Sequence, residues 1–247
     1  LPILVVRIVR SEMGQGTITG LAQMVAEELQ CDWKKVSYDY PSPGENLKRN
    51  KVWGSYSTGG SRGIRTSEQY VRKGGAAARM MLIQAAANQW NVPASECVAK
   101  DSVITHTPSG KKTTFGKVSV AASQLEVPKE VPLKDPKDWT LIGKSVNRID
   151  GVADKVTGRQ IYAIDLKMPG MLVANIKESP VFGGKVKSCD ATTAQKMKGV
   201  KKVVQVGDSA VAVVAETFWQ AKVALDQVNI TWDNGSNANV SSASIKK

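Results

Sequence analysis

Apolar positions divide the start of the chain into a segment with strand character and a segment with helical spacing. Residues 3–9 are rich in β-branched side chains and predict a strand. Apolar residues then recur three and four positions apart, as on one face of a helix: Leu21, Met24, Val25 and Leu29. The glycine-containing loop between these two segments is therefore predicted to join a strand to a helix.

The same patterns predict further elements up to residue 125. In chain order these are a strand, a long helix, a β-hairpin and a short helix: 35–40, 67–90, 102–105 with 112–115, and 117–124. Residues 46–66 show no clear periodicity, and a loop of that length inside a compact domain usually has a function. Gly74 and Gly75 lie inside the long helix, where each glycine costs about 1 kcal/mol relative to alanine. This cost predicts a packing reason, namely the close approach of another backbone.

The chain is predicted to form two domains of mixed α and β structure. Residues 126–140 carry prolines among charged side chains and predict an extended linker between a first domain, 1–125, and a second, 141–235. The second domain alternates strands and helices. Its predicted strands are 161–165, 171–176, 200–206, 210–215 and 228–232, and its predicted helices are 191–197 and 217–227. Its loop at 182–184 is a candidate ligand contact, and a polar tail follows at 236–247.

The first glycine loop has the form of a cofactor-binding segment. Gly14 and Gly16 allow the backbone to approach a bulky ligand, and the amide of Gln15 between them offers two donors and an acceptor. The start of the following helix offers unpaired N–H groups to a phosphate. The alternative is an ordinary strand-to-helix turn, in which the glycines serve only backbone geometry.

A second glycine cluster precedes the long helix. Its candidate cofactor-binding residues are Thr58, Gly59, Gly60, Ser61 and Arg62. The backbone N–H groups of the Gly-Gly-Ser turn can form an anion-binding concavity, and the guanidinium can bind a phosphate through two hydrogen bonds. The alternative is a solvated loop.

Residues 59–63 also match the G-x-S-x-G motif of a hydrolase nucleophile. That motif needs a buried strand directly before it and a helix directly after it, and the sequence predicts neither clearly. The base available in the sequence is His106, the only histidine, which follows Asp101 closely in a predicted hairpin. We expect His106 to be a surface turn residue, so a hydrolase is the weaker interpretation.

Charge and cysteine content exclude several classes of protein. The net charge of +12 is spread over both predicted domains and is not interleaved with stacking aromatic residues, so nucleic acid is not the expected partner. The positive charge can instead steer anionic substrates or an acidic subunit. Cys31, Cys97 and Cys189 are far apart, so an iron–sulfur cluster or a zinc site is not expected within the chain. No apolar run approaches the roughly 20 residues of a membrane-spanning helix, and no signal peptide is visible.

With both glycine clusters in view, the chain resembles a known family. Residues 11–17 followed by 21–29 resemble the molybdopterin-binding large subunit of the xanthine dehydrogenase and aldehyde oxidase family. Four later segments resemble the α/β hammerhead domain of that family: 141–150, 155–158, 164–172 and 211–221. A cofactor-binding segment that precedes the hammerhead domain is the order found in the branch that contains the β-subunit of isoquinoline 1-oxidoreductase.

The resemblance implies a fold, a function and a site. The fold is α+β or α/β, with a molybdopterin-binding segment at 1–125 and a hammerhead domain at 141–235. The function is that of the N-terminal part of a molybdenum hydroxylase, which oxidises an aldehyde or an N-heteroaromatic substrate with oxygen derived from water. Residues 14–16 would contact the pterin, and residues 58–62 would bind its phosphates or flank the molybdenum.

The same resemblance implies cofactors, partners and a location. The cofactor is molybdopterin with molybdenum, in its cytosine dinucleotide form. The partners are the remainder of the large subunit, on this chain or on a second one, a small subunit with [2Fe-2S] clusters, and a cytochrome c subunit. The location is the periplasm, with membrane association through a partner.

The chain is expected to be only part of such a subunit. The family's large subunits are severalfold longer, and this sequence begins with Leu1. The late glutamate that acts as the base in the family is missing, so we assign no catalytic residue to the chain and expect it to be inactive alone. The alternative function is a non-catalytic binding or assembly module, in which the glycine loops only pack against a partner.

Overall fold

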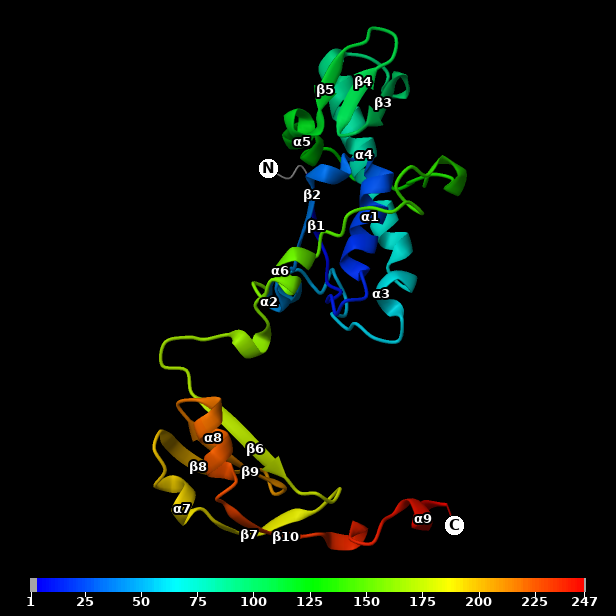
Figure 1. Cartoon of the computed structure of the whole chain (residues 1–247). Coiled ribbons are helices and arrows are strands. Elements are labelled where there is room, and N and C mark those ends of the chain that lie inside the picture. The colour runs from blue at the N-terminus through cyan, green and yellow to red at the C-terminus, as the bar shows by residue number, and fades with distance from the viewer. Residues whose placement is uncertain (1–3, 247) are drawn as a thin grey trace. The chain divides into compact units, whose positions relative to one another are not determined.

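The computed structural model describes residues 4–246, in which the chain divides into two compact units (Figure 1). The first unit runs to Gln160 and the second begins at Ile161. Both units contain helices and strands, which confirms the predicted mixed class of fold. Ile3, at the start of the first predicted strand, and Lys247, at the end of the predicted tail, lie outside the described residues.

The first unit is built around two packed helices, α1 and α4. Its helices and strands are β1 (Leu4–Arg7), α1 (Thr17–Leu29), β2 (Val36–Asp39), α2 (Pro43–Lys48), α3 (Arg62–Arg65), α4 (Glu68–Trp90), β3 (Cys97–Lys100), β4 (Val103–His106), β5 (Lys112–Thr114), α5 (Phe115–Ser123) and α6 (Val152–Val156). Strands β1 and β2 pair in parallel, and β3, β4 and β5 form an antiparallel sheet. This sheet and α5 lie at the C-terminal end of α4, whereas α3 lies at its N-terminal end (Figure 1).

The core of the first unit confirms the predicted periodicity. The buried apolar residues of α1 share one face of the helix: Ile18, Leu21, Ala22, Ala26 and Leu29. They belong to one cluster with Ile104 of β4 and Phe115 of α5. Two parts of the pattern prediction are incomplete. The predicted hairpin has a third strand, β3, and the segment without periodicity, 46–66, contains α3 and the end of α2.

Helices α1 and α4 pack closely because α4 lacks a side chain at the point of contact. A Cβ atom at Gly75 would lie 2.5 Å from the carbonyl oxygen of Val25. The predicted close approach of another backbone is therefore confirmed, and it occurs at Gly75. The neighbouring Gly74 is exposed, and a Cβ atom there would meet no described atom within 4 Å.

A segment that we call the strap, residues 134–150, lies along α1 and is held by buried carboxylates. Glu27 accepts backbone N–H hydrogen bonds from three successive strap residues: Thr140 (2.8 Å), Leu141 (2.5 Å) and Ile142 (3.1 Å). The ammonium group of Lys134 pairs with the same carboxylate. Burial raises the pKa of Glu27, but these hydrogen bonds outweigh burial and hold the pKa below its ordinary value.

The neighbouring carboxylate connects the strap to α4 as well. Glu28 is fully buried and accepts hydrogen bonds from the guanidinium of Arg72 at 2.9 Å and from the backbone N–H of Lys134 at 3.1 Å. Further along, the side-chain amide of Gln23 donates to the carbonyl oxygen of Leu141 at 2.5 Å. Because these contacts join the strap to both helices, the division between the units falls at 160/161, later than the linker predicted at 126–140.

The second unit consists of two small sheets with short helices. Its elements are η4 (Ala163–Asp165), β6 (Val173–Glu178), β7 (Lys185–Asp190), α7 (Thr192–Gln195), β8 (Val200–Val206), β9 (Ala210–Ala215), α8 (Phe218–Leu225), β10 (Asn229–Asp233), η5 (Gly235–Asn237) and α9 (Ser242–Ile245). Strand β9 lies between β6 and β8, and β7 pairs with β10, all antiparallel. Val211 and Val213 of β9 are fully buried and pack with Ala224 and Leu225 of α8.

Most predicted elements of the second unit are confirmed; the differences are the predicted strand at 161–165, the strand β7, and the short helices η5 and α9 at the predicted polar tail. The strand predicted at 161–165 is wrong, because the Asp165 carboxylate accepts the backbone N–H of Tyr162 and closes a 3₁₀ turn there. Strand β7 was missed because Val186, which packs on the core, is its only aliphatic residue, so the segment shows no apolar alternation. Across the described residues of both units, no helix combines the length and hydrophobicity that a membrane crossing requires.

The adjacent glycines of α4 give a matched test of the packing. Gly75→Ala is expected to lower the free energy of unfolding by about 1–3 kcal/mol, because the added methyl group displaces the α1 backbone. Gly74→Ala should be neutral or stabilise by up to about 1 kcal/mol, because alanine is the better helix former. Urea unfolding followed by tryptophan fluorescence measures both. Equal effects of the two substitutions would contradict this helix contact.

Candidate functional site

The structure brings the two predicted glycine clusters together. We call residues 11–16 the first glycine loop and residues 57–62 the second glycine loop. The backbone N–H of Ser11 donates to the hydroxyl oxygen of Thr58 at 2.9 Å. The guanidinium of Arg10, at the end of the segment that follows β1, donates to the carbonyl oxygen of Ser57 at 2.5 Å. The loops thus form one surface, although the sequence separates them widely.

Two further glycines allow this approach. A Cβ atom at Gly63 would lie 2.9 Å from the side chain of Thr17, in the first turn of α1. A Cβ atom at Gly20 would lie 3.1 Å from Ile64 Cδ1, on α3. Helix α3, which begins directly after the second glycine loop, can therefore pack on the start of α1 only where side chains are missing.

The loop glycines themselves are of two kinds. Gly14, Gly16 and Gly60 have φ angles of 100°, 81° and 57°, so their backbone conformation calls for glycine. Gly59 does not have a positive φ, and a Cβ atom there would meet no described atom within 4 Å. Neither packing nor backbone geometry within the described chain restricts position 59 to glycine, and its backbone is open to close approach.

The side-chain amide of Gln15 is hydrogen-bonded to the backbone of its own loop. Its side-chain oxygen accepts the backbone N–H of Met13 at 2.6 Å, and its side-chain nitrogen donates to the carbonyl oxygen of Ser11 at 3.0 Å. The residue is exposed, so the amide lies at the surface of the first glycine loop. Its planar group is thereby held in one orientation.

Arg62 is likewise turned toward its own loop. Its guanidinium donates to the carbonyl oxygen of Gly59 at 3.3 Å and to the hydroxyl of Ser57 at 3.0 Å. Ser61 precedes α3 with a left-handed φ of 55° and caps it without a side-chain hydrogen bond. The second glycine loop therefore presents an exposed cation beside Gly59, as phosphate binding requires.

The N-terminus of α1 differs from expectation, because a carboxylate of the chain caps it. Glu12 accepts backbone N–H hydrogen bonds from Gly14 and Gly16, both at 2.8 Å, and from Ile18 at 3.2 Å. The prediction that the N–H groups at the start of this helix are unpaired and open to a phosphate is therefore wrong for Gly16 and Ile18. The sequence signal was an acidic residue shortly before the helix, a position that the helix dipole favours.

A charged cluster beneath the first glycine loop was not predicted either. The carboxylate of Asp150, fully buried, accepts two hydrogen bonds from Arg148, at 2.5 and 2.9 Å, and one from Lys155 at 2.6 Å. Arg148 holds the pKa of Asp150 far below its ordinary value, and Lys155 adds to this effect against the opposing effect of burial. The available signal was the alternation of charge at the end of the strap.

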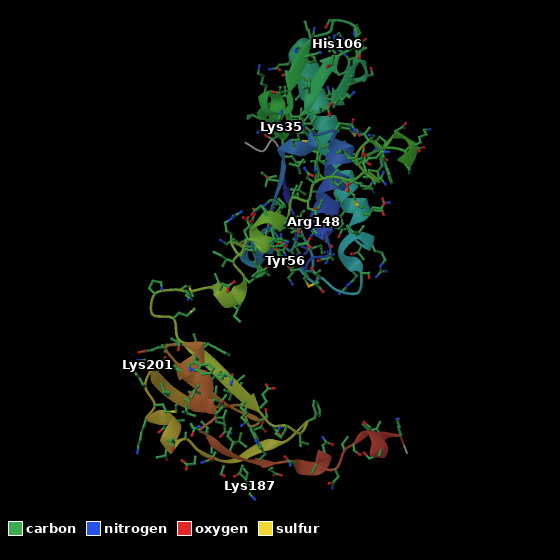
Figure 2. All side chains as sticks on the ribbon, viewed as in Figure 1. Lys35, Tyr56, His106, Arg148, Lys187 and Lys201 are labelled. Carbon is green, nitrogen blue, oxygen red and sulfur yellow. The ribbon has the colours of Figure 1, made fainter. Side chains whose placement is uncertain are left out.

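His106 is buried, so its predicted place in a surface turn is wrong. It lies in β4 and is 6% exposed. Its Nδ1 is 2.6 Å from the Ser109 hydroxyl, and its Nε2 is 2.8 Å from a carboxylate oxygen of Glu96. Figure 2 places His106 at the end of the first unit that is remote from Tyr56 and the second glycine loop. The histidine is thus not beside Ser61, which removes the base from the hydrolase interpretation.

The loop at 182–184, a candidate ligand contact, has structural contacts of its own. In the loop at 182–184, Gly184 is required by the nearby side chain of Ser179, and the carbonyl oxygen of Phe182 accepts a hydrogen bond from Asn237 at 2.9 Å. These contacts account for the local conformation of the loop, and its role as a ligand contact stays a prediction. Within residues 4–246, no group of three or more His, Cys, Asp or Glu side chains is placed to hold a metal ion.

Comparison with known proteins identifies the first unit. Residues 4–160 match the family described as the molybdopterin cofactor-binding domain, a range that includes both glycine loops and the strap. The chain belongs to this family. The match ends where the first compact unit ends, so the molybdopterin cofactor-binding domain includes the segment that the sequence predicted to be a linker.

Several curated proteins are similar over nearly the whole chain. The membrane-bound aldehyde dehydrogenase [pyrroloquinoline-quinone] of Gluconacetobacter polyoxogenes is 31% identical over 98% of the chain. The β-subunit of isoquinoline 1-oxidoreductase from Brevundimonas diminuta and a nicotinate dehydrogenase subunit from Pseudomonas putida are each 28% identical over 90% of it. The chain spans only 32%, 32% and 19% of the length of these three relatives. The roles of the individual loop residues stay predictions.

Asp150 gives a pH-dependent test of the charged cluster. Asp150→Asn is expected to lower the free energy of unfolding by about 1–3 kcal/mol at neutral pH, because asparagine loses charge-assisted hydrogen bonds. The pKa of Asp150 is lowered by folding, so its contribution is complete above the unfolded pKa of about 3.9 and is lost as the pH falls below that value. Urea titrations should therefore show a constant difference from about pH 5 to pH 8 that shrinks below about pH 4.

The control is Asp154→Asn, which removes an exposed carboxylate that pairs with Arg159 at 3.0 Å. Its effect should stay within about 0.5 kcal/mol. If the difference between the unsubstituted chain and Asp150→Asn does not change below pH 4, Asp150 does not carry the charge assigned to it.

Proposed function

We propose that the chain is the front part of the large subunit of a molybdenum oxidoreductase that acts on an aldehyde or an N-heteroaromatic compound. The observation that carries this proposal is the family match over residues 4–160 together with the joined pair of glycine loops inside it. The names of the relatives, which include aldehyde, isoquinoline and nicotinate enzymes, support the class of substrate.

The residues of the two loops fit a pterin that carries a phosphate. In this proposal the amide of Gln15 and the backbone at Gly14 and Gly16 bind the pterin, while Arg62 and the backbone of 58–61 bind its phosphates. The hydrogen-bonded amide of Gln15 and the exposed guanidinium of Arg62 beside Gly59 both support this division. When bound, the cofactor supplies two-electron redox chemistry at molybdenum. The loops orient it, and the base comes from outside this chain.

Several finer points belong to the same proposal. The second unit would be the α/β hammerhead domain, and the cofactor would be the cytosine dinucleotide form of molybdopterin. Electrons would leave through [2Fe-2S] clusters of a small subunit, with a cytochrome c subunit as a further partner, in the periplasm. Membrane association would depend on a partner. These points rest on the resemblance noted in the sequence and on the names of the relatives.

Two alternatives to this function predict different results in a cofactor analysis. One relative is named for pyrroloquinoline quinone, so that quinone is a second candidate cofactor. A non-catalytic assembly module would hold neither group. The complex that contains this chain should be purified and its molybdenum content, pterin and quinone measured after acid release. About one molybdenum and one pterin per complex are expected from the proposal. Quinone without molybdenum, or neither group, would refute it.

Arg62 offers a sharper test within the complex. Arg62→Ala should weaken cofactor retention by roughly tenfold or more, because hydrogen bonds to charged groups contribute about 1.5–3 kcal/mol each. Arg62→Lys should restore retention only in part, because an ammonium group lacks the planar fork of the guanidinium. Arg159→Ala removes an exposed arginine outside the glycine loops and is the control. If Arg62→Ala retains the cofactor as well as Arg159→Ala does, the second glycine loop is only structural.

A further inference from the structure

We propose that Arg148 is a positioning residue that fixes the peptide between Gly14 and Gln15 in one orientation. Its Nη1 donates to the carbonyl oxygen of Gly14 at 3.3 Å, and its Nη2 lies 3.5 Å from Glu12 Oε1. Both groups belong to the first glycine loop, whereas Arg148 belongs to the strap. Figure 2 shows Arg148 in the part of the first unit that also holds Tyr56. The inference rests on the proposed function only for its consequence on the cofactor.

The guanidinium can hold this loop because it is itself held from the other side. Asp150 accepts two hydrogen bonds from Arg148, which is the bidentate geometry that fixes a guanidinium plane. The Asp150 carboxylate is fully buried and is bound from a third direction by Lys155 of α6. The N–H of Ile149, between Arg148 and Asp150, donates to the hydroxyl of Thr19 in the first turns of α1 at 3.2 Å. The end of the strap is therefore docked beside the loop.

Arg148 selects one orientation of the peptide between Gly14 and Gln15, because a guanidinium binds only hydrogen-bond acceptors. Gly14 has a φ of 100°, and a Cβ atom there would meet no described atom within 4 Å, so side-chain sterics do not restrict its backbone. A flip of the peptide between Gly14 and Gln15 would exchange the carbonyl oxygen and the N–H group. Arginine only donates hydrogen bonds, so it stabilises the orientation in which the carbonyl faces it.

Glu12 transmits the same constraint to the rest of the loop. Its carboxylate accepts the N–H groups of Gly14 and Gly16 and lies next to Arg148, with a side chain that is 5% exposed. The cation compensates this nearly buried anion, which would otherwise be costly to desolvate. Arg148 thus acts on the loop at two points, the carbonyl of Gly14 and the carboxylate that caps α1. Gln15 lies between the two fixed peptides.

Hydrogen–deuterium exchange of the full chain tests this role without the cofactor. Arg148→Ala should increase the exchange rate of amides in the first glycine loop by roughly tenfold, because the hydrogen bonds that select one orientation are lost. Arg148→Lys keeps the charge but not the fork and should give a smaller increase. Exchange in α4 and in the β3–β4–β5 sheet should not change, which separates loop positioning from a general loss of stability.

The matched control is Arg159→Ala, because Arg159 also pairs with a nearby aspartate but lies at the surface and 64% exposed. It should leave loop exchange unchanged. If Arg148→Ala fails to fold, Arg148→Lys alone decides. Loop exchange in Arg148→Lys that equals that of the unsubstituted chain, or a uniform increase through α4, would overturn the inference.

A second measurement separates this inference from the proposed function. Molybdopterin retention by the complex is measured for Arg148→Ala and Arg148→Lys, and both should retain less cofactor, in the order of their loop exchange rates. Faster loop exchange with unchanged retention would support the positioning of the peptide and count against the first glycine loop as a cofactor contact. Unchanged loop exchange would overturn the positioning role whatever the retention.

Discussion

The first unit depends on the burial of two adjacent carboxylates at the end of α1. Desolvating Glu27 and Glu28 is unfavourable unless their oxygen atoms are fully hydrogen-bonded. The strap supplies the backbone N–H groups for this purpose, and Lys134 and Arg72 supply the cations. Without the strap, Glu27 would lose Lys134 and three backbone donors, and Glu28 would keep only its pairing with Arg72 of α4. The same requirement explains why the compact unit ends at Gln160 and not at the proline-rich segment.

This arrangement connects the two ends of α1. At the C-terminal end the strap is held by Glu27, and at the other end it brings Arg148 to Glu12 and the first glycine loop. A helix of 13 residues is about 20 Å long. The strap is hydrogen-bonded near both ends of α1, so the first glycine loop lies on a rigid support. Rigid support of this kind is what a binding loop needs in order to hold a ligand in one orientation.

The sequence predicted those parts of the fold that depend on local periodicity. The apolar face of α1, the long helix α4 and the apolar runs of β8 and β9 are properties of neighbouring residues, and the structure confirms these elements. The sequence alone could not predict which groups the charged residues pair with. Glu12, His106 and the charged cluster at Asp150 acquire their roles from hydrogen bonds that the three-dimensional fold creates. Composition predicted an extended backbone after residue 125 but gave no sign of the acceptors on α1 that bind it.

The cap on α1 also changes how the two glycine loops divide their roles. Phosphate at a helix N-terminus competes with any carboxylate already bound there, and Glu12 already accepts the N–H groups of the first glycine loop. An anion is therefore better accommodated at the second glycine loop, where Arg62 is exposed beside Gly59. The first glycine loop is left with the neutral, planar amide of Gln15, which suits the edge of a heterocycle better than a phosphate. Under the proposed function, the carboxylate of Glu12 therefore favours pterin recognition at the first glycine loop and phosphate recognition at the second.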